Sequence, residues 1–298
     1  MNKKDILQRF IFENAPVRGE IVHLGASFET IVSQHPYPPL IQQLLGEMLV
    51  ASVLLSAIIK FKGRLTVQFQ GGDKLKLLIA QCDNEFHIRG LGQWKGDFTA
   101  GELLEDLKKG VLVIIIQPES GGERYQGIVS WQGNSLAESL EGYFRDSEQL
   151  ATRIWLASNE HQTAGLLLQI LPGSSPIKDA MPLPDLNWEQ IVYLTETLKQ
   201  QELLMLDNET LLRRLYSHDN EVRLFPGEPV MFQCTCSTEK SENALLLLGR
   251  EEIDEEIQGK QKIVVTCDFC SKEYAFDAVD IERIFKKGGS SSSSTQLH

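Results

Sequence analysis

QCTCSTEK at 233–240 and VVTCDFCSKEY at 264–274 are the two stretches that decide the fold of the C-terminal part of this chain. They contain a Cys-x-Cys pair and a Cys-x-x-Cys pair, separated by thirty residues. Two close cysteine pairs divided by a loop can present four thiolates tetrahedrally to zinc. The sequence therefore predicts one Zn²⁺ per chain, bound by Cys234, Cys236, Cys267 and Cys270.

A permanent structural zinc site is the simplest interpretation of these pairs, but two details also favour a redox switch. The first pair has only Thr235 between its cysteines, which leaves the backbone less freedom to build an ideal site. Both pairs are also close enough in sequence to close local disulfides once the metal is lost. Each disulfide would consume two zinc ligands, so oxidation and zinc binding exclude one another.

The energetics of a small module predict what oxidation would do. Residues 231–287 form a predicted C-terminal domain whose core alone contributes only a few kcal/mol. Structural zinc in finger peptides contributes roughly 10–16 kcal/mol, whereas a disulfide that closes a very short loop stabilises least. Exchange of zinc for two local disulfides should therefore unfold the module.

The N-terminal part, residues 1–172, is predicted to be an α+β core domain with mixed sheet and helices. Leu65, Val67 and Phe69 alternate with polar residues, which is typical of a half-buried strand. Ser135 and Glu138 form a capping box that opens a helix through Tyr143. Further strands are expected at 75–82, 86–91, 111–116 and 166–170. Cys82 ends one of these runs and is expected to be a small core residue.

Composition predicts a soluble, cytoplasmic protein without a nucleic-acid partner. The net charge is −12, whereas binding to phosphates depends on an excess of Lys and Arg. Charged residues interrupt the first nineteen residues, so no targeting segment is predicted. The longest apolar run, 48–59, is too short for a membrane span and predicts a buried core helix.

Residues 173–230 are predicted to be a helical linker. Prolines and glycines between 171 and 184 mark its start, and Asn187 with Gln190 forms a possible cap of its first helix. A second helix is expected from Asp207 or Asn208. Amphipathic helices of this kind must cover another surface, either as a permanent arm or as a detachable one. The apolar stripe consists of Trp188, Ile191, Val192, Leu198, Leu211, Leu212 and Leu215. The Ser-rich segment 288–298 is predicted to be a disordered tail.

With the cysteine pattern, several longer stretches resemble the redox-regulated 33-kilodalton heat-shock chaperone family of bacteria. The resemblance covers nearly the whole chain and is most specific around the second cysteine pair, although Ala151 stands where proline is expected. The stretches are VRGEIVHL (17–24), YQGIV (125–129), YFRDSEQL (143–150), RLYSHDNEVRLF (214–225) and VTCDFCSKEYAFDAVDIERIF (265–285).

The resemblance implies a redox-regulated, ATP-independent holdase that binds unfolded client proteins and is not an enzyme. The reduced form would hold zinc and be inactive. Oxidation by hypochlorite, or by peroxide with heat, would form the disulfides Cys234–Cys236 and Cys267–Cys270, release zinc, and unfold the C-terminal domain and linker. The resemblance also implies that the oxidised form is a homodimer. From the position of the apolar stripe beside the zinc module, we further expect the stripe to become exposed and to bind clients.

Three rival functions fit the residues less well. A nucleic-acid-binding zinc ribbon needs basic flanks, but Glu239 to Ile257 has seven acids against two bases. A zinc enzyme needs an open coordination position, which four cysteines close. A thiol-disulfide oxidoreductase needs a Cys-x-x-Cys at a helix start, whereas Cys267 follows a predicted strand at 263–265. A constitutive structural zinc protein and an oxidoreductase are the alternatives to the chaperone.

Overall fold

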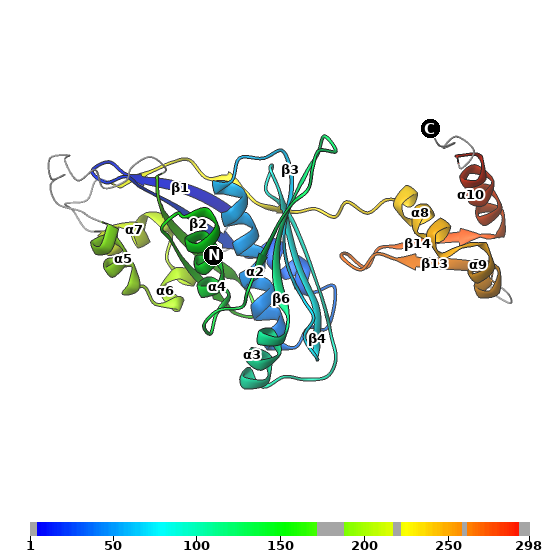
Figure 1. The fold of residues 1–298 in the computed structure, drawn as a ribbon, viewed down its shortest axis with the longest axis horizontal. Coiled ribbons are helices and arrows are strands. Elements are labelled where there is room, and N and C mark those ends of the chain that lie inside the picture. Colours follow the sequence, from blue (N-terminus) through cyan, green and yellow to red (C-terminus); the bar gives the residue numbers. More distant parts are fainter. Residues whose placement is uncertain (1–4, 172–187, 217–221, 258–260, 292–298) are drawn as a thin grey trace. The chain divides into compact units, whose positions relative to one another are not determined.

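A computed structural model describes residues 5–171, 188–216, 222–257 and 261–291 (Figure 1). The chain divides into two compact units, Met1–Gln233 and Cys234–His298. The described helices of the predicted linker belong to the first unit together with the core. The segment 172–187, which contains the expected boundary and the Asn187 cap, lies outside the described residues.

Two six-stranded sheets form the framework of the first unit. The first has the order β10-β1-β2-β9-β8, with β11 also paired to β1, and the second has the order β12-β5-β4-β3-β6-β7. The first sheet consists of β1 (Ile6–Phe12), β2 (Val17–Leu24), β8 (Thr152–Ser158), β9 (Thr163–Ile170), β10 (Val222–Leu224) and β11 (Glu228–Pro229). The second consists of β3 (Gly63–Gln70), β4 (Leu75–Asp83), β5 (His87–Trp94), β6 (Val111–Pro118), β7 (Tyr125–Val129) and β12 (Met231–Phe232).

The expected strands of the core are confirmed, with longer bounds at several ends. In β3 the apolar side chains of Leu65, Val67 and Phe69 are almost completely buried, as their alternation predicts. This strand pairs antiparallel with β4 on one side and β6 on the other, so it lies in the middle of its sheet. Cys82 is fully buried near the end of β4, which confirms its expected place in the core.

Helix α2 (Pro39–Ile58) lies between the two sheets and contacts strands of both (Figure 1). It includes most of the expected core helix and extends it by nine residues toward the N-terminus, starting at a proline that suits the first helical position. By length and composition α2 could cross a membrane, but 72% of its apolar window is buried inside the protein. It is a core helix.

Glycines allow α2 to approach both sheets closely. A Cβ atom on Gly165 of β9 would lie 2.4 Å from Val50 Cγ1, and one on Gly90 of β5 would lie 2.9 Å from Leu45 Cδ1. Both distances are shorter than carbon atoms tolerate in a packed interior. A side chain at either position would therefore push the helix away from its sheet.

Helix α4 (Leu136–Tyr143) begins as expected, because the Ser135 hydroxyl accepts a hydrogen bond from the Glu138 N–H. A short π-helix, η1 (Phe144–Glu148), continues it, and Gln149 ends the run in a left-handed conformation. Helix α1 (Ala26–Val32) follows β2. Helix α1 thus leads from β2 into α2, and α4 with η1 leads from β7 of the second sheet to β8 of the first.

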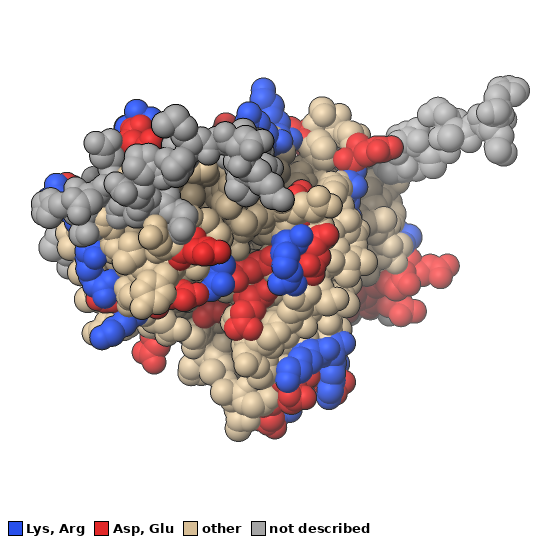
Figure 2. Space-filling model, turned by 60° about the vertical axis from the view of Figure 1, so that its left-hand side comes forward, with Lys and Arg blue, Asp and Glu red and all other residues tan. Residues whose placement is uncertain are grey.

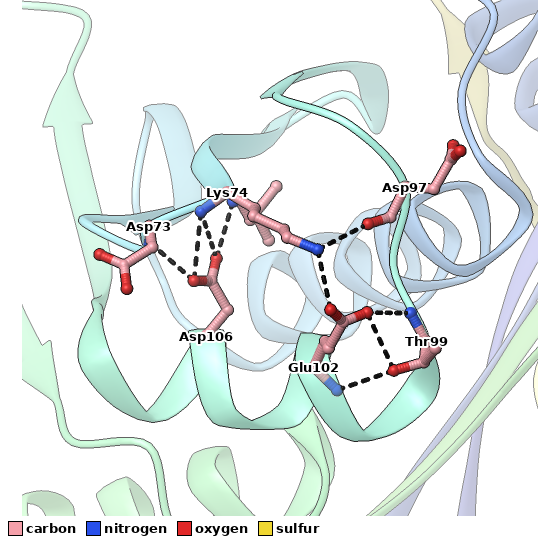
Figure 3. A network of polar contacts seen from close by, with 7 residues as sticks. Asp73, Lys74, Asp97, Thr99, Glu102 and Asp106 are labelled. Carbon is pink, nitrogen blue, oxygen red and sulfur yellow. Dashed lines mark hydrogen bonds and ion pairs between the residues drawn. The ribbon is translucent and has the colours of Figure 1, made fainter.

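Helix α3 (Ala100–Lys109) is attached to the turn between β3 and β4 by a network of hydrogen bonds (Figure 3). The Asp106 carboxylate, which is 5% exposed, accepts from the backbone N–H groups of Asp73, Lys74 and Leu75 at oxygen–nitrogen distances of 2.7–3.2 Å. Glu102 completes a capping box with Thr99 and also accepts from Lys74 Nζ at 3.0 Å. Hydrogen bonds to these two carboxylates thereby hold the turn against α3.

The second unit is small. A hairpin of β13 (Lys262–Thr266) and β14 (Glu273–Asp277) is accompanied by α8 (Thr238–Leu248), α9 (Arg250–Ile257) and α10 (Ala278–Ser291). Helix α10 extends beyond residue 287, where the tail was expected to start, and residues 292–298 lie outside the described part of the chain. The buried core of the described residues consists of Leu245, Ile253, Ile263, Tyr274, Phe276, Ile281 and Ile284.

Candidate metal centre and the linker helices

The structure brings the four C-terminal cysteines together in the second unit. Their sulfur atoms all lie within 4.8 Å of one another. Cys234 Sγ is 3.7 Å from Cys267 Sγ, and Cys236 Sγ is 3.5 Å from Cys270 Sγ. None of the four forms a disulfide, and all are partly exposed. The two cysteine pairs therefore contribute jointly to one cluster.

The second pair is held by the turn of the β13–β14 hairpin. The Cys267 N–H donates to the Lys272 carbonyl at 2.9 Å, and the Ser271 N–H donates to the Cys267 carbonyl at 2.8 Å. Ser271 has a φ of 54°, a left-handed conformation that turns the chain back toward β14. The backbone thus folds around the position that both sulfurs face.

The first pair lies immediately before α8. Ser237 caps this helix by accepting from the Lys240 N–H, and Lys240 Nζ donates to the Thr235 carbonyl at 2.6 Å. These contacts fix the backbone between and after the two cysteines. The single intervening residue is thereby held in a conformation that directs both sulfurs to the cluster.

The sulfur separations fit a tetrahedral metal site. A Zn–S distance of about 2.3 Å places the sulfurs of an ideal tetrahedron about 3.8 Å apart. The 3.5 Å and 3.7 Å separations lie close to that value, and the largest is below 4.8 Å. Four soft sulfur ligands select zinc or another thiophilic ion rather than magnesium or calcium.

The cysteine thiols of the cluster have different electrostatic surroundings. Burial raises the pKa of the Cys236 thiol, but a hydrogen bond from the Tyr274 hydroxyl and contacts with the other thiols lower it to about 7 overall. Burial and the neighbouring thiols raise the pKa of Cys270 to about 12, although the Lys272 N–H donates to it. Cys82, buried in the first unit, has its pKa raised by burial to about 12 and is chemically inert by comparison.

The linker helices cover the outer face of the first sheet, opposite to α2 (Figure 1). They are α5 (Trp188–Glu196), α6 (Gln200–Met205) and α7 (Asn208–Tyr216), and α7 starts where the sequence predicts. Ile191 and Leu211 are completely buried, and Trp188 and Leu198 are partly buried. Their partners on the sheet include Phe10, Phe12, Ile21, Leu166 and Leu168. Most of the predicted stripe thus faces the core.

Polar contacts also attach the linker helices to the sheet. His23 Nε2 lies 2.8 Å from the Leu203 carbonyl, and Asn208 Nδ2 donates to Gln8 Oε1 at 2.7 Å. The Tyr216 ring packs edge-on against Phe12, with ring centroids 4.8 Å apart. Sequence patterns did not predict these polar residues, because each depends on a partner about 180 or more residues away.

Comparison with known proteins shows to which family the chain belongs. A family model described as Hsp33 protein matches residues 5–277, which is most of the chain. The chain belongs to the Hsp33 family. The resemblance noted from the cysteine pattern and the longer stretches is therefore confirmed.

Curated relatives in the Hsp33 family are similar over their whole length. The 33 kDa chaperonin of Azotobacter vinelandii is 44% identical over 301 residues, covering 100% of both chains. The 33 kDa chaperonin of Nitrosococcus oceani is 45% identical over 285 residues, covering 96% of both.

A solved Hsp33 structure has the same fold. The 33 kDa chaperonin (heat shock protein 33 homolog) of Thermotoga maritima superposes with a TM-score of 0.79 at 21% identity, covering 97% of this chain and 100% of that one. At this identity the likeness establishes the fold alone. Together with the four-cysteine cluster, it confirms the expected α+β class with a small C-terminal cysteine-bearing domain.

Proposed function

We propose that this protein is a redox-regulated, ATP-independent chaperone of the cytoplasm, with a zinc switch built from Cys234, Cys236, Cys267 and Cys270. The proposal rests chiefly on one observation: four converging sulfurs lie in a unit whose described core contains only seven buried side chains. Membership of the Hsp33 family, whose relatives bear the name 33 kDa chaperonin, supports the chaperone activity. The same names support a protein that binds other proteins rather than an enzyme.

In the reduced form, the four cysteines would hold one Zn²⁺ as thiolates. The ion would supply a cross-link that keeps the two cysteine pairs together, worth roughly 10–16 kcal/mol in small zinc domains. A core of seven side chains cannot replace that contribution. The fold of the second unit therefore depends on the four sulfurs remaining thiolates.

Oxidation would remove the ligands. With hypochlorous acid, one thiolate sulfur attacks chlorine and the O–Cl bond breaks with release of hydroxide. A second thiolate then attacks that sulfur, the S–S bond forms and chloride leaves, so two electrons pass from two sulfurs to chlorine. A disulfide sulfur no longer carries the charge that binds zinc. We propose the pairs Cys234–Cys236 and Cys267–Cys270, because near neighbours in sequence have the highest effective concentration.

The linker would carry the signal to the client-binding surface. Its helices bury an apolar stripe against Phe10, Phe12 and Leu166 of the first sheet. We propose that unfolding of the second unit allows these helices to leave the sheet and exposes both apolar surfaces. Contiguous apolar surface of several hundred Å² is what binding of unfolded clients requires. Such surfaces could also mediate homodimerisation of the oxidised form.

The face of the molecule in Figure 2 agrees with a partner class other than nucleic acid. On this face Lys and Arg side chains lie beside Asp and Glu and form no continuous basic area. The net charge of −12 also disfavours binding to the negatively charged phosphates of nucleic acid. We propose unfolded proteins, rather than nucleic acid or a membrane, as the partners.

A stoichiometry experiment separates the chaperone from the oxidoreductase. The oxidised protein is expected to suppress aggregation of a chemically unfolded client at near-equimolar ratios, without ATP and without turnover of a model disulfide. Multiple turnovers of the model disulfide by catalytic amounts of protein, with no suppression of aggregation, would contradict the proposal and favour the oxidoreductase.

The stability of the first unit is expected to fall as pH rises, because of Glu47. This residue of α2 borders a cavity of about 240 Å³ that is otherwise lined by uncharged residues, including Leu198 and Leu203 of the linker. Burial raises the pKa of Glu47 to about 7 despite a hydrogen bond from Gln43. The folded protein therefore favours the protonated acid, and stability falls as pH rises from about 5 through 7, by at most about 3 kcal/mol.

The variant Glu47→Gln tests this dependence. At pH 4, below the pKa of an unfolded glutamate, its guanidine unfolding midpoint should be close to that of the wild type, whereas at pH 8.5 the variant should be the more stable. Only the difference between the two proteins is used, because Glu20, whose pKa burial also raises to about 7, contributes equally to both. A difference that does not change between the two pH values would show that Glu47 ionisation does not affect the stability of the folded protein.

A further inference from the structure

Tyr274 of β14 contacts the cysteine cluster through its side-chain hydroxyl. Its hydroxyl donates a hydrogen bond to Cys236 Sγ at an oxygen–sulfur distance of 3.1 Å. The residue is 8% exposed, and its ring belongs to the small apolar core of the second unit. On the hairpin it stands opposite Val265, two residues before Cys267. The core thus holds the hydroxyl against one sulfur.

Three of the four sulfurs receive hydrogen bonds from different donors. Cys267 receives the backbone N–H groups of Phe269 and Cys270, and Cys270 receives that of Lys272. These donors are backbone N–H groups of the hairpin turn, so substitution of a side chain does not remove them. The donor to Cys236, by contrast, is the side-chain hydroxyl of Tyr274. A single substitution can therefore change the surroundings of this sulfur and leave the turn intact.

A hydrogen bond to a thiolate lowers its reactivity toward oxidants. The donor draws electron density from sulfur and must be displaced or weakened as sulfur attacks. For thiolates, nucleophilicity falls with decreasing basicity with a coefficient of about 0.4–0.5. Hydrogen bonds to ligand sulfurs also tune the chemistry of metal-bound thiolates. Loss of one charge-assisted hydrogen bond should thus accelerate attack by about three- to tenfold.

We propose that Tyr274 is a positioning residue that holds back the oxidation of Cys236 and thereby sets the oxidant level at which the switch opens. The inference rests on the proposed zinc switch and adds a residue that tunes its threshold. With hydrogen peroxide, the Cys236 thiolate attacks one oxygen, the O–O bond breaks and hydroxide leaves. A second cysteine thiolate then attacks the resulting sulfenic acid, an S–S bond forms and the second hydroxide leaves. Tyr274 restrains the first of these attacks.

The variant Tyr274→Phe removes the hydroxyl and keeps the ring in the core. The reduced, zinc-loaded protein is treated with hydrogen peroxide, and sulfenic acid at each cysteine is trapped with dimedone and counted by mass spectrometry. Zinc release is followed in parallel with a chromogenic chelator. Trapping at Cys236 is expected to be about three- to tenfold faster in the variant, with early rates at Cys267 and Cys270 unchanged. Tyr193→Phe, the same change at a 71% exposed residue of α5, is the control.

Two further measurements separate the hydrogen bond from packing. In cobalt-substituted protein, Tyr274→Phe should shift the sulfur-to-cobalt charge-transfer band. If Tyr274 acted only by packing its ring in the core, the band would not move. Incorporation of 3-fluorotyrosine at position 274, a stronger donor of the same shape, should slow trapping at Cys236 and covers the case in which Tyr274→Phe folds poorly.

Equal trapping rates in the wild type and both variants, or equal acceleration at all four cysteines in Tyr274→Phe, would overturn the role of Tyr274. Retention of zinc by the wild type under peroxide and hypochlorite would instead contradict the zinc switch itself.

Discussion

Replacement of Cys267 by serine is expected to abolish zinc binding by the reduced protein and to unfold the second unit. Three thiolates with one hydroxyl form a much weaker zinc site, because the hydroxyl is a poor soft ligand. The unit then loses most of the roughly 10–16 kcal/mol that zinc supplies to small domains. Its remaining core is the seven-residue cluster around Ile263 and Phe276.

Zinc content by plasma mass spectrometry and hydrogen exchange of the backbone amides measure both effects. Amides of β13, β14 and α10 should exchange at the rate of an unfolded chain in Cys267→Ser, while those of β3 and β4 stay protected. Cys82→Ala is the control, since this cysteine is buried in the other unit. Unchanged metal content in Cys267→Ser would remove this cysteine from the zinc site.

The double variant Ile191→Glu with Leu198→Glu is expected to act as a holdase without oxidation. Ile191 is completely buried between α5 and the first sheet, and Leu198 is partly buried beside the cavity under α6. A carboxylate in an apolar contact of this kind costs several kcal/mol. The cost is relieved if the helices leave the sheet. Reduced, zinc-loaded protein should then suppress client aggregation to a substantial fraction of the oxidised wild type.

The control adds the same charge at exposed positions of the linker helices α5 and α6. Tyr193→Glu with Gln201→Glu should leave the reduced protein inactive, because both side chains already face water. Trypsin cleavage after Lys199 and Arg213 reports linker release directly. If the double variant is cleaved rapidly and yet stays inactive, linker release is insufficient and the unfolded zinc domain must itself bind clients.

Local patterns in the sequence predicted the parts of the fold that depend on local chemistry. Alternation of Leu65, Val67 and Phe69 identified β3, and the Ser135 cap identified the start of α4. The cysteine spacing predicted a cluster because two close cysteine pairs divided by a loop can present four thiolates to one zinc ion. These features require no knowledge of distant parts of the chain.

The packing of helices on both faces of the first sheet could not be predicted in the same way. β1 and β2 were not identified by their alternation, because β2 is buried on both faces: Ile21 faces the linker helices, and Val22 faces α2. The consecutive apolar residues of β9 are explained in the same way, because β9 is also buried on both faces. Such strands indicate a layer on either side, which is the signal that could have placed the linker on the sheet. The Tyr274 hydroxyl near Cys236 depends on the hairpin register and gave no pattern.

The switch is tested most directly by one measurement made before and after hypochlorite: zinc content, free thiols and client aggregation in the same sample. The reduced protein should contain one zinc per chain and five free thiols, and should not protect the client. After oxidation, zinc should be in solution, Cys82 should be the remaining thiol, and aggregation should be suppressed. Peptide mapping should find Cys234 joined to Cys236 and Cys267 joined to Cys270. Equal protection by the reduced, zinc-bound protein, or zinc retained while protection appears, would contradict a zinc redox switch.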